Sequence, residues 1–241
     1  MAAKQAWLSA FLFTVMALLS PIAAAQTRHV AIDLVAETPR PAAGSTVTLA
    51  FDSRPERDWH GYWQNPGDAG VETRLTWTLP EGVKAGGLRY PVPERLIVAG
   101  LMNYVYEAPF AQLVDLTIPA GLAPGTRLPI TVKADYLVCT TEICVPEMQT
   151  LATELVVGDG AIDAATRARF DAWRQKLPRP LGSPATWQIA DGQFRLAVPF
   201  PAGADGDAGA VYFYPLAGGA IDYAAPQVAV RDGDRLQQQA P

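Results

Sequence analysis

Residues 128–157, LPITVKADYLVCTTEICVPEMQTLATELVV, decide the fold of this chain. Residues 128–139 and 148–157 are apolar or alternating runs of the kind that forms β-strands. Between these runs lie Cys139 and Cys144, the only cysteines of the chain. Five positions of extended strand would separate their Cα atoms by about 16 Å, whereas a disulfide needs about 4.4 to 6.8 Å. Pairing of the two cysteines therefore requires a hairpin, with both sulfurs at its mouth, at one end of a sheet and near solvent.

Runs of the same kind recur from His29 to about Asp159, separated by Pro, Gly and Asp roughly every 8 to 12 residues. Residues 46–51, TVTLAF, show the period-two alternation of a half-buried strand. The strands predicted in this part are residues 30–35, 46–51, 74–79, 96–98, 112–118, 128–139 and 148–157. Seven such strands are typical of an immunoglobulin-like β-sandwich. We therefore expect an all-β domain of this class over residues 27–159.

A short helix and a Pro-rich linker are predicted for residues 160–184. The helix covers residues 163–176, with Asp163 as its N-cap and Pro178 as its stop. The apolar residues that share one face of this helix are Ile162, Phe170, Trp173 and Leu177. Residues 177–184 contain three prolines and a glycine, a composition typical of a stiff connector between domains.

A second β module is predicted for residues 185–241. Alternating residues around the Asp191-Gly192 turn indicate a hairpin, and residues 211–214 and 227–230 indicate further strands. After a turn at residues 231–234, the return strand fades into a polar tail. A module ending on an unpaired turn would leave an edge unprotected, so we expect this one to be truncated. A frayed terminal tail is the alternative.

The composition excludes several classes of protein. Of the 241 residues, 49% are hydrophobic and 18% are charged, which is enough apolar material for a core and argues against wholesale disorder. The net charge of −5 argues against nucleic acid as the main partner. A Gly-rich loop of the phosphate-binding kind is missing as well, which argues against nucleotides.

The first 25 residues have the plan of a cleaved signal peptide. Lys4 precedes an apolar run over residues 6–19, and small residues follow at 23–25. The run of about 14 residues is shorter than the roughly 20 that a membrane span needs. We therefore expect residues 1–25 to be removed and the mature chain, without a membrane span, to be periplasmic, where cysteines can form disulfides.

Three chemistries are open to Cys139 and Cys144. A structural disulfide closing so short a loop contributes only about 2 kcal/mol, against roughly 4 to 5 kcal/mol for a loop of about a hundred residues. This difference favours a redox-active pair over a structural one. Acidic residues near the pair in sequence, Asp135, Glu142 and Glu147, argue against a strongly stabilised thiolate.

A metal site is the third possibility. The two cysteines, with His60 and either Met102 or Met148, would offer soft ligands to Cu(I) and, less well, to Zn(II). The C-x4-C spacing differs from the usual C-x2-C of zinc fingers. We therefore predict a site without metal or cofactor.

Residues 59–68 combine aromatic side chains with a turn signature. Asn65-Pro66-Gly67-Asp68 is a favourable turn sequence. We expect the aromatic residues Trp59, Tyr62 and Trp63 to fill the end of the sandwich. The alternative is that Tyr62 and its neighbours line the surface around the two cysteines.

Several motifs, taken in order, resemble a known family. They are HGYWQNPGDAG at 60–70, WTLPEG at 77–82, NYVYE at 103–107, the Cys-x4-Cys-Val-Pro-Glu stretch at 139–147, FYP at 213–215 and AAPQ at 224–227. Together they look like the periplasmic N-terminal part of DsbD-type membrane thiol:disulfide interchange reductases, especially the ScsB-like branch linked to copper tolerance. The resemblance covers nearly all of the chain after residue 25.

The resemblance implies an immunoglobulin-like domain that relays electrons as part of a protein-disulfide reductase. Its partners would be thioredoxin-like periplasmic proteins and a membrane electron-donor domain, with a further link to cytochrome c-type biogenesis. This chain has no Cys-x-x-Cys and no spanning helix, and it is open whether it works alone or as a piece of a longer protein. The rival function is a non-enzymatic copper-binding or scaffold module.

The resemblance also assigns roles to residues. Cys144 resembles the cysteine that joins partners covalently, so we expect Cys144 to attack a partner disulfide and Cys139 to resolve the mixed disulfide. The reverse assignment is the alternative. Tyr104, Val105 and Tyr106 resemble in position an aromatic cap loop that shields the dithiol until a partner displaces it. For the two tyrosines, the alternative is that they are ordinary aromatic residues at the sandwich edge.

Overall fold

The computed structural model describes residues 28–200 and 211–241. The predicted signal peptide, residues 1–25, lies outside the described residues. Within the described ranges, no helix combines the length and the hydrophobicity of a membrane span.

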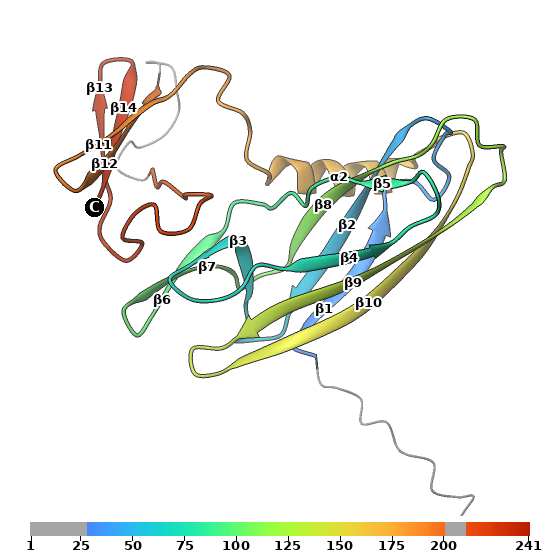
Figure 1. The fold of residues 1–241 in the computed structure, drawn as a ribbon, viewed down its shortest axis with the longest axis horizontal. Helices are drawn as coiled ribbons and strands as arrows, with labels where there is room; N and C mark the ends of the chain where they lie inside the picture. Colours follow the sequence, from blue (N-terminus) through green and yellow to red (C-terminus); the bar gives the residue numbers. More distant parts are fainter. Residues whose placement is uncertain (1–27, 201–210) are drawn as a thin grey trace, which may run out of the picture.

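Two antiparallel sheets pack face to face and form the sandwich (Figure 1). One sheet has the strand order β1-β2-β8-β5, with bounds Val30–Ala36, Thr46–Pro55, Phe110–Thr117 and Lys84–Ala85. The other has the order β10-β9-β4, with bounds Cys144–Val156, Arg127–Cys139 and Arg74–Thr78. Alternate residues of β2, such as Leu49 and Phe51, meet residues of β9, such as Ile130 and Val132, in the buried core. The predicted all-β, immunoglobulin-like class is confirmed.

A third sheet extends the sandwich at the end that carries the cysteines. Its order is β3-β7-β6, with bounds Gly61–Gly67, Leu101–Tyr106 and Glu94–Val98. Only β6 overlaps a strand predicted from the sequence. Strand β3 was not predicted, because its sequence contains residues typical of a turn. Its pairing with β7 shifts register between Tyr62 and Gly67. The residues expected in a cap loop, 104–106, form part of strand β7.

Helix α2 (Ala164–Gln175) covers the outer face of the first sheet and confirms the predicted helix. Asp163 caps it, because its carboxylate accepts a hydrogen bond from the Thr166 backbone N–H at 2.9 Å. Phe170 is fully buried against Ala50 and Leu113, which point away from the sandwich core on β2 and β8. The helix therefore seals the sandwich on the face opposite the second sheet.

The C-terminal sheet has four antiparallel strands in the order β11-β12-β14-β13. Their bounds are Thr186–Ala190, Gln193–Pro199, Arg235–Ala240 and Val228–Asp232. The predicted hairpin around Asp191-Gly192 is confirmed. The expectation that the last strand fades was wrong, because β14 lies in the centre of the sheet and pairs with both β12 and β13. Strand β14 was not predicted because its sequence is largely polar, although Leu236, Gln238 and Ala240 are buried.

The strand predicted for residues 211–214 was also wrong. The Phe213 backbone bonds to the side-chain amide of Gln227, donating its N–H at 2.8 Å and accepting at 3.0 Å, instead of joining a sheet. Residues 211–226, here called the aromatic segment, run without regular strand structure between the C-terminal sheet and the sheet β3-β7-β6. Their aromatic side chains join the two parts in one buried cluster.

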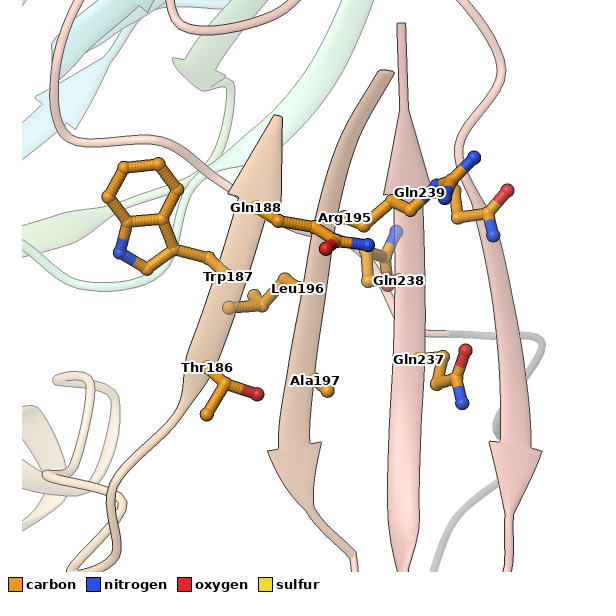
Figure 2. Close-up of a pocket in the computed structure, with 9 residues that line it drawn as sticks. All are labelled: Thr186, Trp187, Gln188, Arg195, Leu196, Ala197, Gln237, Gln238 and Gln239. Atoms are coloured by element: carbon orange, nitrogen blue, oxygen red, sulfur yellow. The ribbon is translucent and has the colours of Figure 1, made fainter. Parts of the chain in front are cut away.

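A hollow of about 290 Å³ lies on the C-terminal sheet. Figure 2 shows that Gln188, Arg195, Gln237 and Gln239, from β11, β12 and β14, surround it. Neutral amides and one guanidinium supply most of its polar atoms. The hollow belongs to the C-terminal sheet, which is separate from the tip of the β9–β10 hairpin (Figure 1).

Candidate functional site

Cys139 and Cys144 form a disulfide at the mouth of the β9–β10 hairpin. They are directly opposite each other in the strand ladder, with an S–S distance of 2.01 Å and a Cα–Cα distance of 4.1 Å. The connecting turn is closed by a 2.8 Å hydrogen bond from the Thr140 N–H to the Ile143 carbonyl. The Thr140 hydroxyl accepts from the backbone N–H groups of Glu142 and Ile143, each at 3.1 Å. The chain reversal expected from the spacing is therefore present, and its own side chains stabilise it.

The two sulfurs have different surroundings. Cys139 is only 1% exposed, whereas Cys144 is an exposed residue at the tip. The Cys139 backbone is also fixed by two hydrogen bonds with His60, one in each direction, at 2.9 and 3.1 Å. One cysteine of the pair is thus buried inside the fold while the other is an exposed residue.

Four side chains pack around Cys139. It shares a buried cluster with Tyr62 of β3 and Val105 of β7, and Leu96 and Leu137 pack at the edge of this cluster. The sequence predicts Val105 as a cap residue. For Tyr62 it predicts packing at the end of the sandwich, with a position beside the cysteines as the alternative. Leu96 was placed in a predicted strand but not connected with the site, because its contact with the hairpin is long-range.

The structure does not bring Tyr104 and Tyr106 to the disulfide. Successive side chains of a strand point to opposite faces, so these two residues flank Val105 on the other face of β7. Both belong to a different buried cluster, with Trp63 and residues of the aromatic segment. The Tyr106 hydroxyl donates to the Pro91 carbonyl at 2.7 Å. Of the three residues expected in the cap, 104–106, only Val105 therefore packs in the cluster that contains Cys139.

The polar groups nearest the site are neutral or point away from it. Burial lowers the pKa of His60 and raises that of Tyr62, so both are uncharged at neutral pH. Glu147, which the sequence placed beside the pair, lies on the opposite face of β10 and is 4% exposed. It accepts hydrogen bonds from the His29 N–H at 2.7 Å and the Tyr136 hydroxyl at 3.0 Å. The disulfide consequently lies in a largely apolar setting, with Glu142 exposed on the turn.

The ligand set considered for copper is not assembled. Met102 belongs to the aromatic cluster on the far face of β7, and Met148 is 46% exposed on β10. Among the described residues, no group of three or more His, Cys, Asp or Glu side chains is placed to hold a metal ion.

A groove of about 370 Å³ runs along the hairpin beside the disulfide. Leu137 and Pro146 lie on the same face of the hairpin as the two cysteines, one alternation back from the tip, and Met148 lies one alternation further. Val71 forms the opposite wall and is 46% exposed. Exposed apolar surface therefore continues from the disulfide along the hairpin, as is common at protein-binding sites.

Comparisons with known proteins agree with this architecture. The family model described as "Thiol:disulfide interchange protein DsbD, N-terminal" matches residues 32–155. The comparison with curated proteins found no match. Among solved structures, the N-terminal periplasmic domain of ScsB from Proteus mirabilis aligns with a TM-score of 0.62 at 16% identity, covering 89% of this chain and 80% of that chain.

Two further solved structures align over about half of the chain. The major pilin subunit BcpA of Bacillus cereus has a TM-score of 0.33 at 13% identity, covering 53% of this chain and 40% of that chain. The GAE domain of yeast GGA1 has a TM-score of 0.29 at 16% identity, covering 54% of this chain and 96% of that chain. The ScsB domain is thus the one of the three that shares the fold over most of both chains.

Proposed function

Because this chain belongs to the family of DsbD N-terminal domains of thiol:disulfide interchange proteins, we propose that it relays electrons in the periplasm through Cys139 and Cys144. The observation that carries the proposal is the disulfide itself, with one cysteine exposed and one buried, at a tip where it has little value for stability.

In the first half of the relay, a donor dithiol reduces the Cys139–Cys144 disulfide. A thiolate of a donor dithiol attacks the exposed sulfur of Cys144, the Cys139–Cys144 bond breaks, and the electron pair leaves on Cys139. The second donor thiol then attacks the donor's own sulfur in the mixed disulfide and releases Cys144. The donor has become a disulfide and the domain a dithiol, so two electrons and two protons have moved. The proposed donor is a thioredoxin-like domain linked to a membrane reductase.

In the second half the domain is oxidised again. The Cys144 thiolate attacks the disulfide of an oxidised periplasmic partner, which releases one partner thiolate and forms a mixed disulfide. Cys139 then attacks the Cys144 sulfur, the mixed disulfide breaks, and the partner leaves as a dithiol. Cys144 is assigned the attacking role because it is exposed, and Cys139 the resolving role because its burial denies it to a large partner.

The apolar surroundings support a pair that reacts mainly with a docked partner. Desolvation disfavours a thiolate, and Cys139 is only 1% exposed. A partner that covers Cys144 and the exposed groove along the hairpin would supply the contacts that a small oxidant lacks. The covering side chains, Val105 above all, keep the resolving sulfur shielded until then.

Trapping of partners tests the relay. The full chain with Cys139→Ser, exported to the periplasm of a Gram-negative cell, should accumulate a covalent adduct through Cys144 on a non-reducing gel. The matched variant Cys144→Ser should give little adduct, because its remaining sulfur is covered. Absence of adduct with both variants would count against the relay. If Cu(I) then binds stoichiometrically to the wild type and not to Cys144→Ser, the chain is a copper-binding module instead.

A further inference from the structure

We propose that Tyr104 is a positioning residue, through which the aromatic segment holds strand β7 in place and so keeps Val105 over Cys139. The exposure of Cys139 is then set by a part of the chain that lies outside residues 32–155. This inference rests on the proposed exchange function, since it concerns how the exchanging pair is shielded.

Strand β7 is buried on both faces, and each face serves a different neighbour. Val105 points to Cys139 and Tyr62. Tyr104, the preceding residue, points to the opposite side and is 0% exposed. Figure 1 shows β6 and β7 between the tip of β9–β10 and the aromatic segment. A shift of the strand on one face must therefore change the packing on the other.

Tyr104 is enclosed by three tyrosines of the aromatic segment. Its hydroxyl lies 3.0 Å from that of Tyr212. Its ring centroid lies 5.1 Å from that of Tyr214 and 5.7 Å from that of Tyr223, both in edge-to-face geometry. Aromatic pairs of this kind contribute beyond the area that they bury. The segment thus forms a socket for a single side chain of β7.

The segment also contacts the strands on either side of β7. On β3, the Asn65 side chain donates to the Pro215 carbonyl at 2.8 Å and to the Tyr223 hydroxyl at 3.2 Å. On β6, the guanidinium of Arg95 lies 4.4 Å above the ring of Tyr212. Because Arg95 and Tyr104 are directly paired in the β6–β7 ladder, the segment fastens the outer face of the whole three-stranded sheet.

This fastening matters because β6 is the terminal strand of that sheet and has few partners of its own. Leu96, which packs beside the Cys139 cluster, belongs to it. Without the segment, the β6–β7 hairpin would keep its irregular ladder to β3 and its packing on the Cys139 cluster, and would lose the contacts that hold Tyr104 on the other face. Local opening of such a hairpin is a low-energy event in folded proteins. It would uncover Cys139, whose sulfur leaves as a thiolate when Cys144 is attacked, so that water can stabilise the charge and speed reduction.

The test uses the full chain and changes only the aromatic segment. In the double variant Tyr212→Ala/Tyr214→Ala, the second-order rate of disulfide reduction by dithiothreitol should rise about tenfold, as expected when opening becomes about 1.4 kcal/mol easier. In that reaction dithiothreitol is oxidised to its cyclic disulfide and Cys139–Cys144 is reduced to two thiols. The control Trp187→Ala removes an aromatic ring that is 67% exposed on the C-terminal sheet, and should leave the rate unchanged.

Two additions keep the test decisive if the double variant is poorly folded. Tyr212→Phe keeps the ring beneath Arg95 and loses only the hydroxyl contacts, so its rate should stay within about threefold of the wild type. Amide hydrogen exchange should become faster in β6 and β7 of the double variant while β9 and β10 stay protected.

Equal reduction rates in the double variant and the wild type, with unchanged exchange in β7, would overturn the positioning role. That outcome leaves the relay itself intact, because it is judged by partner trapping. Conversely, a disulfide that dithiothreitol reduces faster in the double variant but that forms no partner adduct would retain the positioning role and reject the relay.

Discussion

Cys139 and Cys144 are directly opposite each other in the β9–β10 ladder, yet one is 1% exposed and the other lies in solvent. The asymmetry arises because a neighbouring sheet packs on one sulfur only, through Tyr62 and Val105. A disulfide in which only one cysteine is exposed favours attack at the sulfur of that cysteine. Ordered thiol:disulfide exchange requires such a preference.

Gly70→Ala should loosen the cover of Cys139 through Tyr62. Gly70 has a φ of +104°, and a Cβ there would overlap the Tyr62 ring. The strained φ alone costs about 1 to 2 kcal/mol, and displacement of the ring adds to this. Denaturant titration should show the loss, and reduction by dithiothreitol should be faster. Gly87→Ala is the control, since nothing lies within 4 Å of the added methyl; a similar loss in both variants would refute the explanation.

Glu147→Gln should lower stability and leave the redox chemistry alone. The carboxylate uses both oxygens as acceptors, one for the His29 N–H and one for the Tyr136 hydroxyl. An amide has one acceptor oxygen, so one buried donor loses its partner at a cost of about 1 to 3 kcal/mol. The midpoint potential should stay within about 10 mV of the wild type, because Glu147 is on the face opposite the cysteines. Glu154→Gln, in an exposed ion pair with Arg127, should cost less than about 1 kcal/mol.

The stability of the domain should fall in mild acid, with His60 as a cause. Burial lowers the pKa of His60 below its ordinary value of 6.5. Between the two pKa values the unfolded chain binds the proton and the folded chain does not, so the free energy of unfolding decreases as the pH drops below about 6.5. In His60→Asn the curve measured between about pH 7 and pH 5 should be flatter. An unchanged slope would mean that other groups cause the dependence.

Phe170→Ala should separate the stability of the sandwich from the chemistry of its tip. Phe170 is fully buried between helix α2 and the outer face of the first sheet. Its truncation should cost about 3 to 5 kcal/mol without a change in the midpoint potential. Leu181→Ala, which removes a side chain that is 52% exposed, is the matched control. A shift in potential for Phe170→Ala alone would reveal coupling that the separation of the two sites does not predict.

Local patterns were sufficient to predict much of the fold. The β9–β10 hairpin, helix α2 and the Asp191-Gly192 turn each depend on neighbours in sequence, and each was predicted. The turn between Cys139 and Cys144 was also predicted, because the two cysteines can form a disulfide only if the chain reverses between them. For these elements, propensity and tertiary packing agree.

The missed elements are those whose environment comes from distant parts of the chain. Strand β7 has apolar residues on both faces, because one face meets Cys139 and the other meets the aromatic segment, so it lacks the alternation of a half-buried strand. Residues 211–214 look like a strand, but their backbone partner is the side chain of Gln227. The strand pairing of β7 decides which of residues 104–106 faces the disulfide. Because this pairing is long-range, the sequence could not predict the orientation of these side chains.

The midpoint potential of the Cys139–Cys144 pair tests the central claim most directly. The full chain is equilibrated with glutathione buffers of graded potential, and its free thiols are counted by mass after alkylation. An exchanging pair should give a midpoint between about −120 and −270 mV, the range of thiol:disulfide exchange proteins. A pair that stays oxidised to below about −300 mV would behave as a structural disulfide, and would contradict the proposed relay.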